Sequence, residues 1–106
     1  MTHFDDCFEL LIGHEGKLSL DPRDRGNWTD GNYGRSGGTL VGSMYGVSAM
    51  SYPRVDIRNL TLAGAKAIYR RDYWTRIGAD TLEPALAFAA FDTAVNAGVG
   101  RAAGYL

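Results

Sequence analysis

The chain has 106 residues, a net charge of −1, 45% hydrophobic residues and 22% charged residues. These values are typical of a globular protein and argue against disorder, and this length suits one domain, spanning residues 1–106. The charge gives no basic excess to hold a polyphosphate, so we expect no nucleic-acid partner. No apolar run approaches the roughly 18 to 20 residues that span a bilayer, so we expect no stable membrane insertion.

The beginning of the chain bears on where the protein is made. Residues 1–6 contain neither a basic segment nor a leader-like apolar run, so we expect synthesis in the cytoplasm without a recognisable signal peptide. Cys7 is the single cysteine and has no partner for an internal disulfide. Its position on the first predicted helix favours a small buried hydrophobic residue over a nucleophile.

The first predicted helix covers residues 3–15 and has a carboxylate in line with its apolar face. Five residues at helical spacing share this face: Phe4, Phe8, Leu11, Ile12 and Glu15. At the C-terminal end of a helix, beside apolar groups, desolvation and the helix dipole both favour the protonated form of Glu15, which suits a general acid. The alternative is a helix that frays at Gly16 and leaves Glu15 in water.

The segment after this helix predicts a small strand-and-loop region. Residues 17–20 alternate like a short strand, and residues 21–26 have the composition of a turn. Glycines are dense from Gly26 to Gly46, and a loop of this length in a small domain is usually functional. Residues 45–48 predict the end of a short strand, and residues 51–53 a brief helical turn.

Two further long helices follow. Thr61 predicts an N-cap, and Gly78 predicts the end of a helix with a regular apolar stripe. The stripe consists of Leu62, Ala65, Tyr69, Tyr73 and Ile77. Pro84 predicts the first turn of a third helix that is apolar on all sides, so we expect it to be buried, with Asp92 and Asn96 on one side near its end. Residues 100–106 predict the start of another helix, so we expect a chain truncated at its C-terminus.

Several kinds of site lack their usual signals. His14 has no second histidine four residues away, so we expect no metal, and no cofactor motif is present. No Gly-x-Ser-x-Gly motif of a serine hydrolase occurs. The remaining candidates are Glu15 and the loop carboxylates Asp21, Asp24 and Asp30, and a protonated acid followed by an ionised one is the pattern of glycoside hydrolysis. The alternative is a solvated loop rich in aspartate because turns favour aspartate.

Five motifs in order resemble those of the glycoside hydrolase family 108 muramidases, lysozyme-like enzymes common in phage endolysins and prophage regions. The motifs are Glu15-Gly16, the turn at 21–26, Tyr45-Gly46-Val47-Ser48, the segment 68–74 and the segment 91–98. The resemblance runs from about residue 4 to residue 106. The family commonly has a second glycine where this chain has Lys17, and a compact Gly-Gly-x-Thr link where this chain has the longer segment 27–42.

The resemblance implies an α+β fold, mainly helical and lysozyme-like, with a helical lobe, a small β lobe over about residues 17–48 and a cleft between the two lobes. The implied reaction is hydrolysis of the β-1,4 bond between N-acetylmuramic acid and N-acetylglucosamine. In this interpretation Glu15 protonates the leaving oxygen, and Asp24 supports the oxocarbenium-like transition state or positions water. Ser48 holds that water, and Tyr45 and Asn96 contact sugars.

The expected partner is therefore the glycan strands of peptidoglycan, bound by a monomer that acts on the cell wall or in the periplasm. A second hypothesis is a lysozyme-like module that binds peptidoglycan, or forms a structural part of a phage particle, without cutting it. A chitinase on a related fold is a third hypothesis and requires only a changed subsite.

Overall fold

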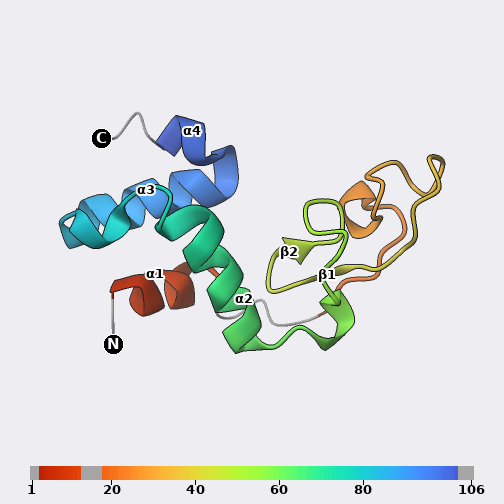
Figure 1. Cartoon of the computed structure of the whole chain (residues 1–106), viewed down its shortest axis with the longest axis horizontal. Coiled ribbons are helices and arrows are strands. Elements are labelled where there is room, and N and C mark those ends of the chain that lie inside the picture. The colour runs from red at the N-terminus through yellow and green to blue at the C-terminus, as the bar shows by residue number, and fades with distance from the viewer. Residues whose placement is uncertain (1–2, 13–17, 103–106) are drawn as a thin grey trace. The chain divides into compact units, whose positions relative to one another are not determined.

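The computed structural model describes residues 3–12 and 18–102. The chain forms two compact units, the first from the described parts of Met1–Leu11 and Lys66–Leu106, the second from those of Ile12–Ala65. Figure 1 shows the elements in chain order. Helices predominate, and the two strands form a small antiparallel sheet, so the predicted α+β, mainly helical class is confirmed.

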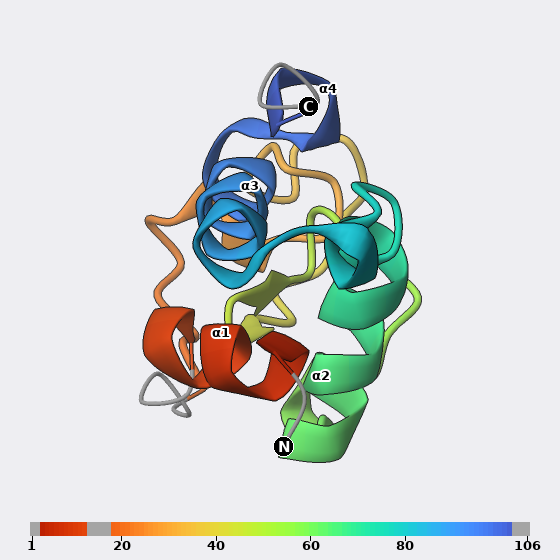
Figure 2. The same cartoon turned by 90° about the vertical axis from the view of Figure 1, so that its left-hand side faces the viewer.

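The first unit is helical. It contains α1 (His3–Leu11), the end of α2 (Leu62–Tyr69), α3 (Pro84–Ala97) and α4 (Val99–Ala102). Helix α3 contacts both α1 and α4, and Figure 2 shows this arrangement from the side of the helices. Among the described residues, no helix has the length and apolar character needed to cross a membrane.

Aromatic rings form the core of the first unit. The ring centroid of Phe4 lies 5.5 Å from that of Trp74 and 5.8 Å from that of Phe91, both edge-on. Phe8 meets Tyr69 in the same way at 5.5 Å. All five rings are buried, and edge-to-face pairs of this kind add to the stabilisation from burial alone. The predicted inward positions of Phe4 and Phe8 are confirmed.

The described part of helix α1 is shorter than the predicted helix. It begins at His3 as expected and ends at Leu11, with Ile12 in a turn; the expected continuation over residues 13–15 lies outside the described residues. Cys7 is buried, as predicted, and burial together with the charge of Asp6 raises the pKa of its thiol. A raised pKa keeps the thiol protonated, which disfavours a nucleophilic role.

Helix α2 continues into a π turn, which the sequence did not predict. Thr61 caps it as expected, its Oγ1 accepting the Gly64 N–H at 3.0 Å, and Gly78 ends the helical segment with a φ of 67°. The π turn covers Arg70–Trp74 and adds one residue to the turn. Trp74 is therefore buried along with Tyr69, while Tyr73, which the stripe placed inward, is only half-buried. Leu62, the first residue of the predicted stripe, is exposed.

Helix α3 begins at Pro84 as predicted, and the Glu83 side chain caps it by accepting the N–H groups of Ala85 and Leu86. The expectation that this helix is buried on all sides is wrong. Its fully covered residues lie on one face: Ala87, Ala90, Phe91 and Ala94. The rest of its surface is partly or fully exposed, because the other elements of this unit cover only that face.

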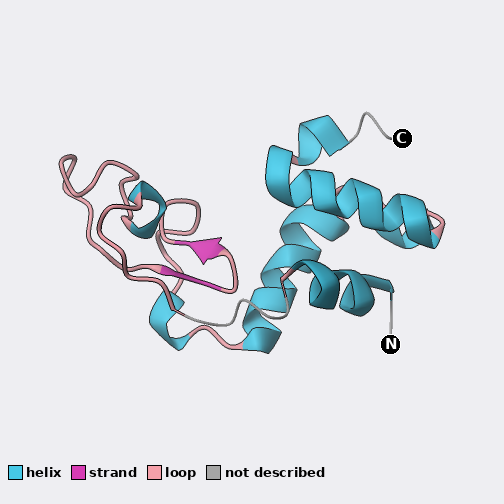
Figure 3. Ribbon diagram, turned by 180° about the vertical axis from the view of Figure 1, so that it is seen from behind, coloured by secondary structure: helices cyan, strands magenta, loops and turns pink. Residues whose placement is uncertain are grey.

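The second unit consists mostly of loops around a small hairpin (Figure 3). Strands β1 (Ser43–Met44) and β2 (Val47–Ser48) pair antiparallel, with Ser43 opposite Ser48. Tyr45 and Gly46 form the two-residue turn with φ values of 52° and 74°, the signs of a type I′ turn, whose twist suits a hairpin.

Two local predictions in this unit differ from the structure. Of the strand expected over residues 17–20, the described part makes only a single bridge, from Ser19 to Ser43. Near residues 51–53, where a helical turn was expected, the Tyr52 N–H donates to the Ser48 carbonyl at 2.9 Å in a single turn, and the nearest helix is the 3₁₀ turn Ile57–Asn59. The expected strand failed because strand pairing depends on a partner that is distant in the sequence.

Asn27 is a fully buried polar side chain in the second unit. Its Nδ2 donates to Ser19 Oγ at 3.2 Å and to the Asp21 carbonyl at 3.1 Å, and its Oδ1 accepts from Ser43 Oγ at 2.6 Å. Its carbonyl accepts the N–H groups of Val41 and Gly42, both at 2.9 Å. One residue therefore joins three segments that are separate in the sequence.

We predict that Asn27→Ala destabilises the protein, because it removes the three hydrogen bonds of a buried amide and leaves the half-buried Ser43 hydroxyl without its partner. Such a loss costs about 1 to 3 kcal/mol. In a domain of this size that lowers Tm by at least about 4 °C, which calorimetry or thermal melting measures. Asn59→Ala is the matched control, since Asn59 is exposed and should change stability by less than about 0.5 kcal/mol. Equal Tm values for the two variants would contradict the role of Asn27.

Candidate active site

Glu15, the predicted general acid, lies outside the described residues. The structure places the other predicted site residues in two groups. Asp24, Tyr45 and Ser48 belong to the second unit, and Asn96 belongs to the first.

Asp24 is fixed at the start of a short 3₁₀ turn, Arg25–Asn27. Its Oδ1 accepts the Gly26 N–H at 2.9 Å, and its carbonyl accepts the Asn27 N–H at 3.1 Å. Within residues 3–12 and 18–102, no hydrogen bond engages its Oδ2. The side chain is exposed, so this carboxylate is held in place while one oxygen stays available.

Ser48 lies beside Asp24 on the other side of Gly26. A Cβ added to Gly26 would be 3.2 Å from Asp24 Oδ1 and 4.0 Å from Ser48 Cβ, so both side chains approach the same point. The Met50 N–H donates to the Gly26 carbonyl at 3.0 Å and fixes the two segments together. We call Asp24, Gly26 and Ser48 the Asp24 site.

The other two loop aspartates differ from Asp24 in how their oxygens are used. Both oxygens of Asp21 accept from the Arg23 side chain, at 3.1 and 3.2 Å, and this pairing lowers the pKa of Asp21. Both oxygens of Asp30 accept backbone N–H groups. Of the three, Asp24 is therefore the carboxylate best able to act on a substrate or a water molecule.

Asp30 organises the glycine-rich loop that follows it, which we call the Asp30 loop (residues 30–38). Its Oδ1 accepts the N–H groups of Asn32 and Gly34 at 2.9 and 3.1 Å, and its Oδ2 accepts those of Ser36 and Gly38 at 3.0 and 3.2 Å. Partial burial alone would raise the pKa of Asp30, but the four bonds outweigh it and lower the pKa to about 2. The carboxylate is thus a structural anion.

The two predicted sugar-contact residues occupy different settings. Tyr45 is half-buried in the hairpin turn, close in sequence to Ser48. Asn96 is exposed near the end of α3, where its Nδ2 donates to the Asp92 carbonyl at 2.9 Å and to Asp92 Oδ1 at 2.7 Å. Asp92 and Asn96 therefore share one side of α3, as predicted, and in addition Asn96 is a hydrogen-bond partner of Asp92. Their roles toward a sugar stay predictions.

Metal ligation finds no support in the described part of the chain. No group of three or more histidine, cysteine, aspartate or glutamate side chains lies close enough there to hold a metal ion.

Sequence reasoning missed the roles of Gly26 and Asn27. Gly26 is predicted only as the end of a turn, but its lack of a side chain also leaves room for the Asp24 carboxylate, since an added Cβ would be 3.2 Å from Asp24 Oδ1. Asn27 adjoins this turn, and an amide next to a glycine gives no sequence signal of burial because asparagine is common in exposed turns.

Comparison with known proteins gives the class of the chain, which is a glycosidase domain. The matching family is described as Glycosyl hydrolase 108, and its model covers residues 8–98. Since this is most of the chain, the protein belongs to that family, and the family resemblance seen in the sequence is confirmed. No curated protein matches the chain.

We predict that the stabilising contribution of Asp30 is lost in acid. A carboxyl whose pKa falls from 3.8 to about 2 on folding stabilises the folded state fully above about pH 4, and this contribution is lost as the pH falls through 2. Between pH 5 and pH 2 the Tm of the wild type should therefore fall more than the Tm of Asp30→Asn, whose side chain does not titrate.

At neutral pH, Asp30→Asn should be cleaved faster by trypsin after Arg35.

The control is Asp56→Asn, which changes an exposed aspartate outside the Asp30 loop. It should leave the cleavage rate after Arg35 unchanged. Equal acid sensitivity of wild type and Asp30→Asn would show that the loop does not depend on the Asp30 charge.

Proposed function

We propose that this protein is a peptidoglycan hydrolase, an N-acetylmuramidase that cleaves the β-1,4 bond between N-acetylmuramic acid and N-acetylglucosamine. Membership of the glycosyl hydrolase 108 family carries the proposal, because the matched segment contains Glu15 and the Asp24 site. We further propose a phage or prophage endolysin that is made in the host cytoplasm and acts, as a monomer, on the cell wall or in the periplasm.

In the proposed mechanism Glu15 donates a proton to the leaving glycosidic oxygen. Asp24 stabilises the positive charge that develops on the sugar, or orients the water that attacks it. The position of Asp24 supports this role, since one oxygen is fixed by the Gly26 N–H and the other has no partner among the described residues. A carboxylate held in this way needs little reorganisation during the reaction.

Ser48 is proposed to bind the water. Its hydroxyl lies on the segment that meets Gly26, and its Oγ accepts the Ser51 N–H at 3.3 Å. That bond leaves the hydroxyl proton free to donate, since a hydroxyl is both donor and acceptor.

We predict that Glu15→Gln folds with an unchanged Tm but loses activity by about 10²- to 10⁴-fold, the usual contribution of a general acid. The measurement is the release of reducing ends from purified peptidoglycan. Glu9→Gln is the matched control, because Glu9 is exposed on α1 and should keep full activity. Full activity of Glu15→Gln would reject the assignment. Binding of peptidoglycan by the wild type without any release would favour the non-catalytic hypothesis.

We predict that Asp24→Asn lowers turnover by about 10²-fold, because it removes the charge that the transition state needs. The asparagine oxygen can still accept the Gly26 N–H, so Tm should hardly change. Asp21→Asn is the matched control: it removes a carboxylate that is also exposed but pairs with Arg23. Similar small losses in both variants would show that Asp24 takes no part in catalysis.

A further inference from the structure

Two residues other than glycine have a positive φ in the described part of the chain, and both are tyrosines: Tyr33 at 58° and Tyr45 at 52°. Side chains with a Cβ are disfavoured there, and glycine or asparagine is the usual choice. Packing does not explain Tyr33, whose surface is 40% exposed. A bulky residue kept in a strained, exposed position points to a function of its ring.

Tyr33 is held rigidly despite its exposure. The residues on either side of it, Asn32 and Gly34, both donate their N–H groups to Asp30 Oδ1. Gly34 also rests on the Trp28 ring, because a Cβ added there would be 2.9 Å from Trp28 Cζ3. An aromatic ring presented on a fixed loop loses little entropy when a ligand binds to it.

Arg35 adds a positive charge to this ring. Its guanidinium carbon lies 5.4 Å from the centroid of the Tyr33 ring, within the range of a cation–π contact. Among the residues that the structure describes, no carboxylate forms a salt bridge with Arg35. Both side chains are exposed, so an apolar ring face and an unneutralised cation lie together on the surface.

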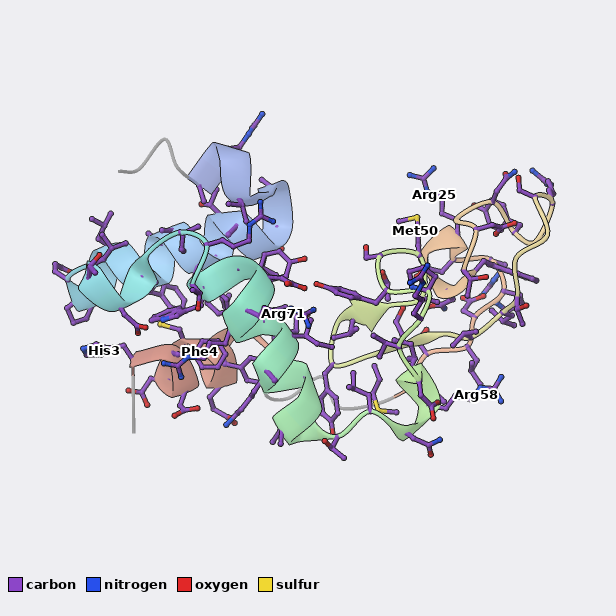
Figure 4. All side chains as sticks on the ribbon, viewed as in Figure 1. His3, Phe4, Arg25, Met50, Arg58 and Arg71 are labelled. Atoms are coloured by element: carbon purple, nitrogen blue, oxygen red, sulfur yellow. The ribbon has the colours of Figure 1, made fainter. Side chains whose placement is uncertain are left out.

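The Asp30 loop is joined to the Asp24 site through Met50. A Cβ added to Gly31 would be 2.6 Å from Met50 Sδ, so the start of the loop rests on this side chain. The Met50 N–H in turn donates to the carbonyl of Gly26 in the Asp24 site. In Figure 4 this connection can be found by the labels of Met50 and of Arg25, the residue before Gly26. A ligand on Tyr33 therefore binds to the same structural unit as the candidate catalytic aspartate.

We propose that Tyr33 and Arg35 form a binding subsite for peptide-substituted glycan strands, a role that rests on the proposed hydrolase function. The ring of Tyr33 packs against the C–H face of a sugar, and Arg35 pairs with a carboxylate of the substituent on the strand.

The test measures co-sedimentation with purified insoluble peptidoglycan, in a Glu15→Gln background so that strands stay uncut. Tyr33→Asn should weaken binding about three- to tenfold, corresponding to the loss of one aromatic contact. Its Tm should stay the same or rise, because asparagine tolerates a positive φ. Tyr33→Phe should bind as tightly as the parent. Leu62→Asn is the control, since it removes an apolar side chain of similar exposure, 38%, elsewhere.

Arg35→Gln tests the charge. The binding of the parent should weaken as salt is added, and Arg35→Gln should lose part of this dependence, because screening acts on the ion pair that it removes. In the active protein, Tyr33→Asn should raise KM several-fold and leave kcat nearly unchanged, the sign of lost ground-state binding.

Unchanged binding and KM in Tyr33→Asn would overturn the subsite. If the wild type still released reducing ends in that case, the proposed function would stand without it. If the wild type neither bound peptidoglycan nor released reducing ends, the proposed function would fail and the subsite with it.

Discussion

The buried amide of Asn27 is the interaction on which the second unit depends. A unit built mostly of loops has few apolar side chains to bury, and its chain segments need another reason to stay together. Asn27 makes hydrogen bonds with Ser19, Asp21 and Ser43. It is also the last residue of the 3₁₀ turn that Asp24 caps. The position of the candidate catalytic carboxylate therefore follows from a buried polar group, whereas the first unit depends on packed aromatic rings.

Much of the helical fold could be predicted from the sequence, because helix signals are local. Thr61, Gly78 and Pro84 mark helix ends by their own chemistry, and all three do so in the structure. The π turn at Arg70–Trp74 could not be predicted, since one added residue changes which ring is buried without altering the composition of the helix. The strand expected near Ser19 failed because pairing depends on a distant segment.

The candidate site was predictable as a set of residue types but less so as an arrangement. Asp24 and Ser48 came from ordered motifs, and the structure brings them to either side of Gly26. Their approach depends on the hairpin and on a backbone bond from Met50, neither of which leaves a pattern in the sequence. The choice of Asp24 over Asp21 and Asp30 rests on which carboxylate oxygens already accept hydrogen bonds, and the sequence does not contain that information. The catalytic role of Glu15 stays a prediction.

The Asp30 loop is closed by a carboxylate at its own first residue, and this has a consequence for how the segment varies. All four bonds to Asp30 come from within the next eight positions, so the loop requires no long-range contact to close and can form early in folding. The Asp30 oxygens accept backbone N–H groups, and any residue except proline can donate such a group at positions 32 and 36. Residues 32, 35 and 36 are therefore open to exchange while the loop keeps its shape, whereas the φ of 58° at position 33 restricts that residue. The loop resembles a paratope carried on a constant framework.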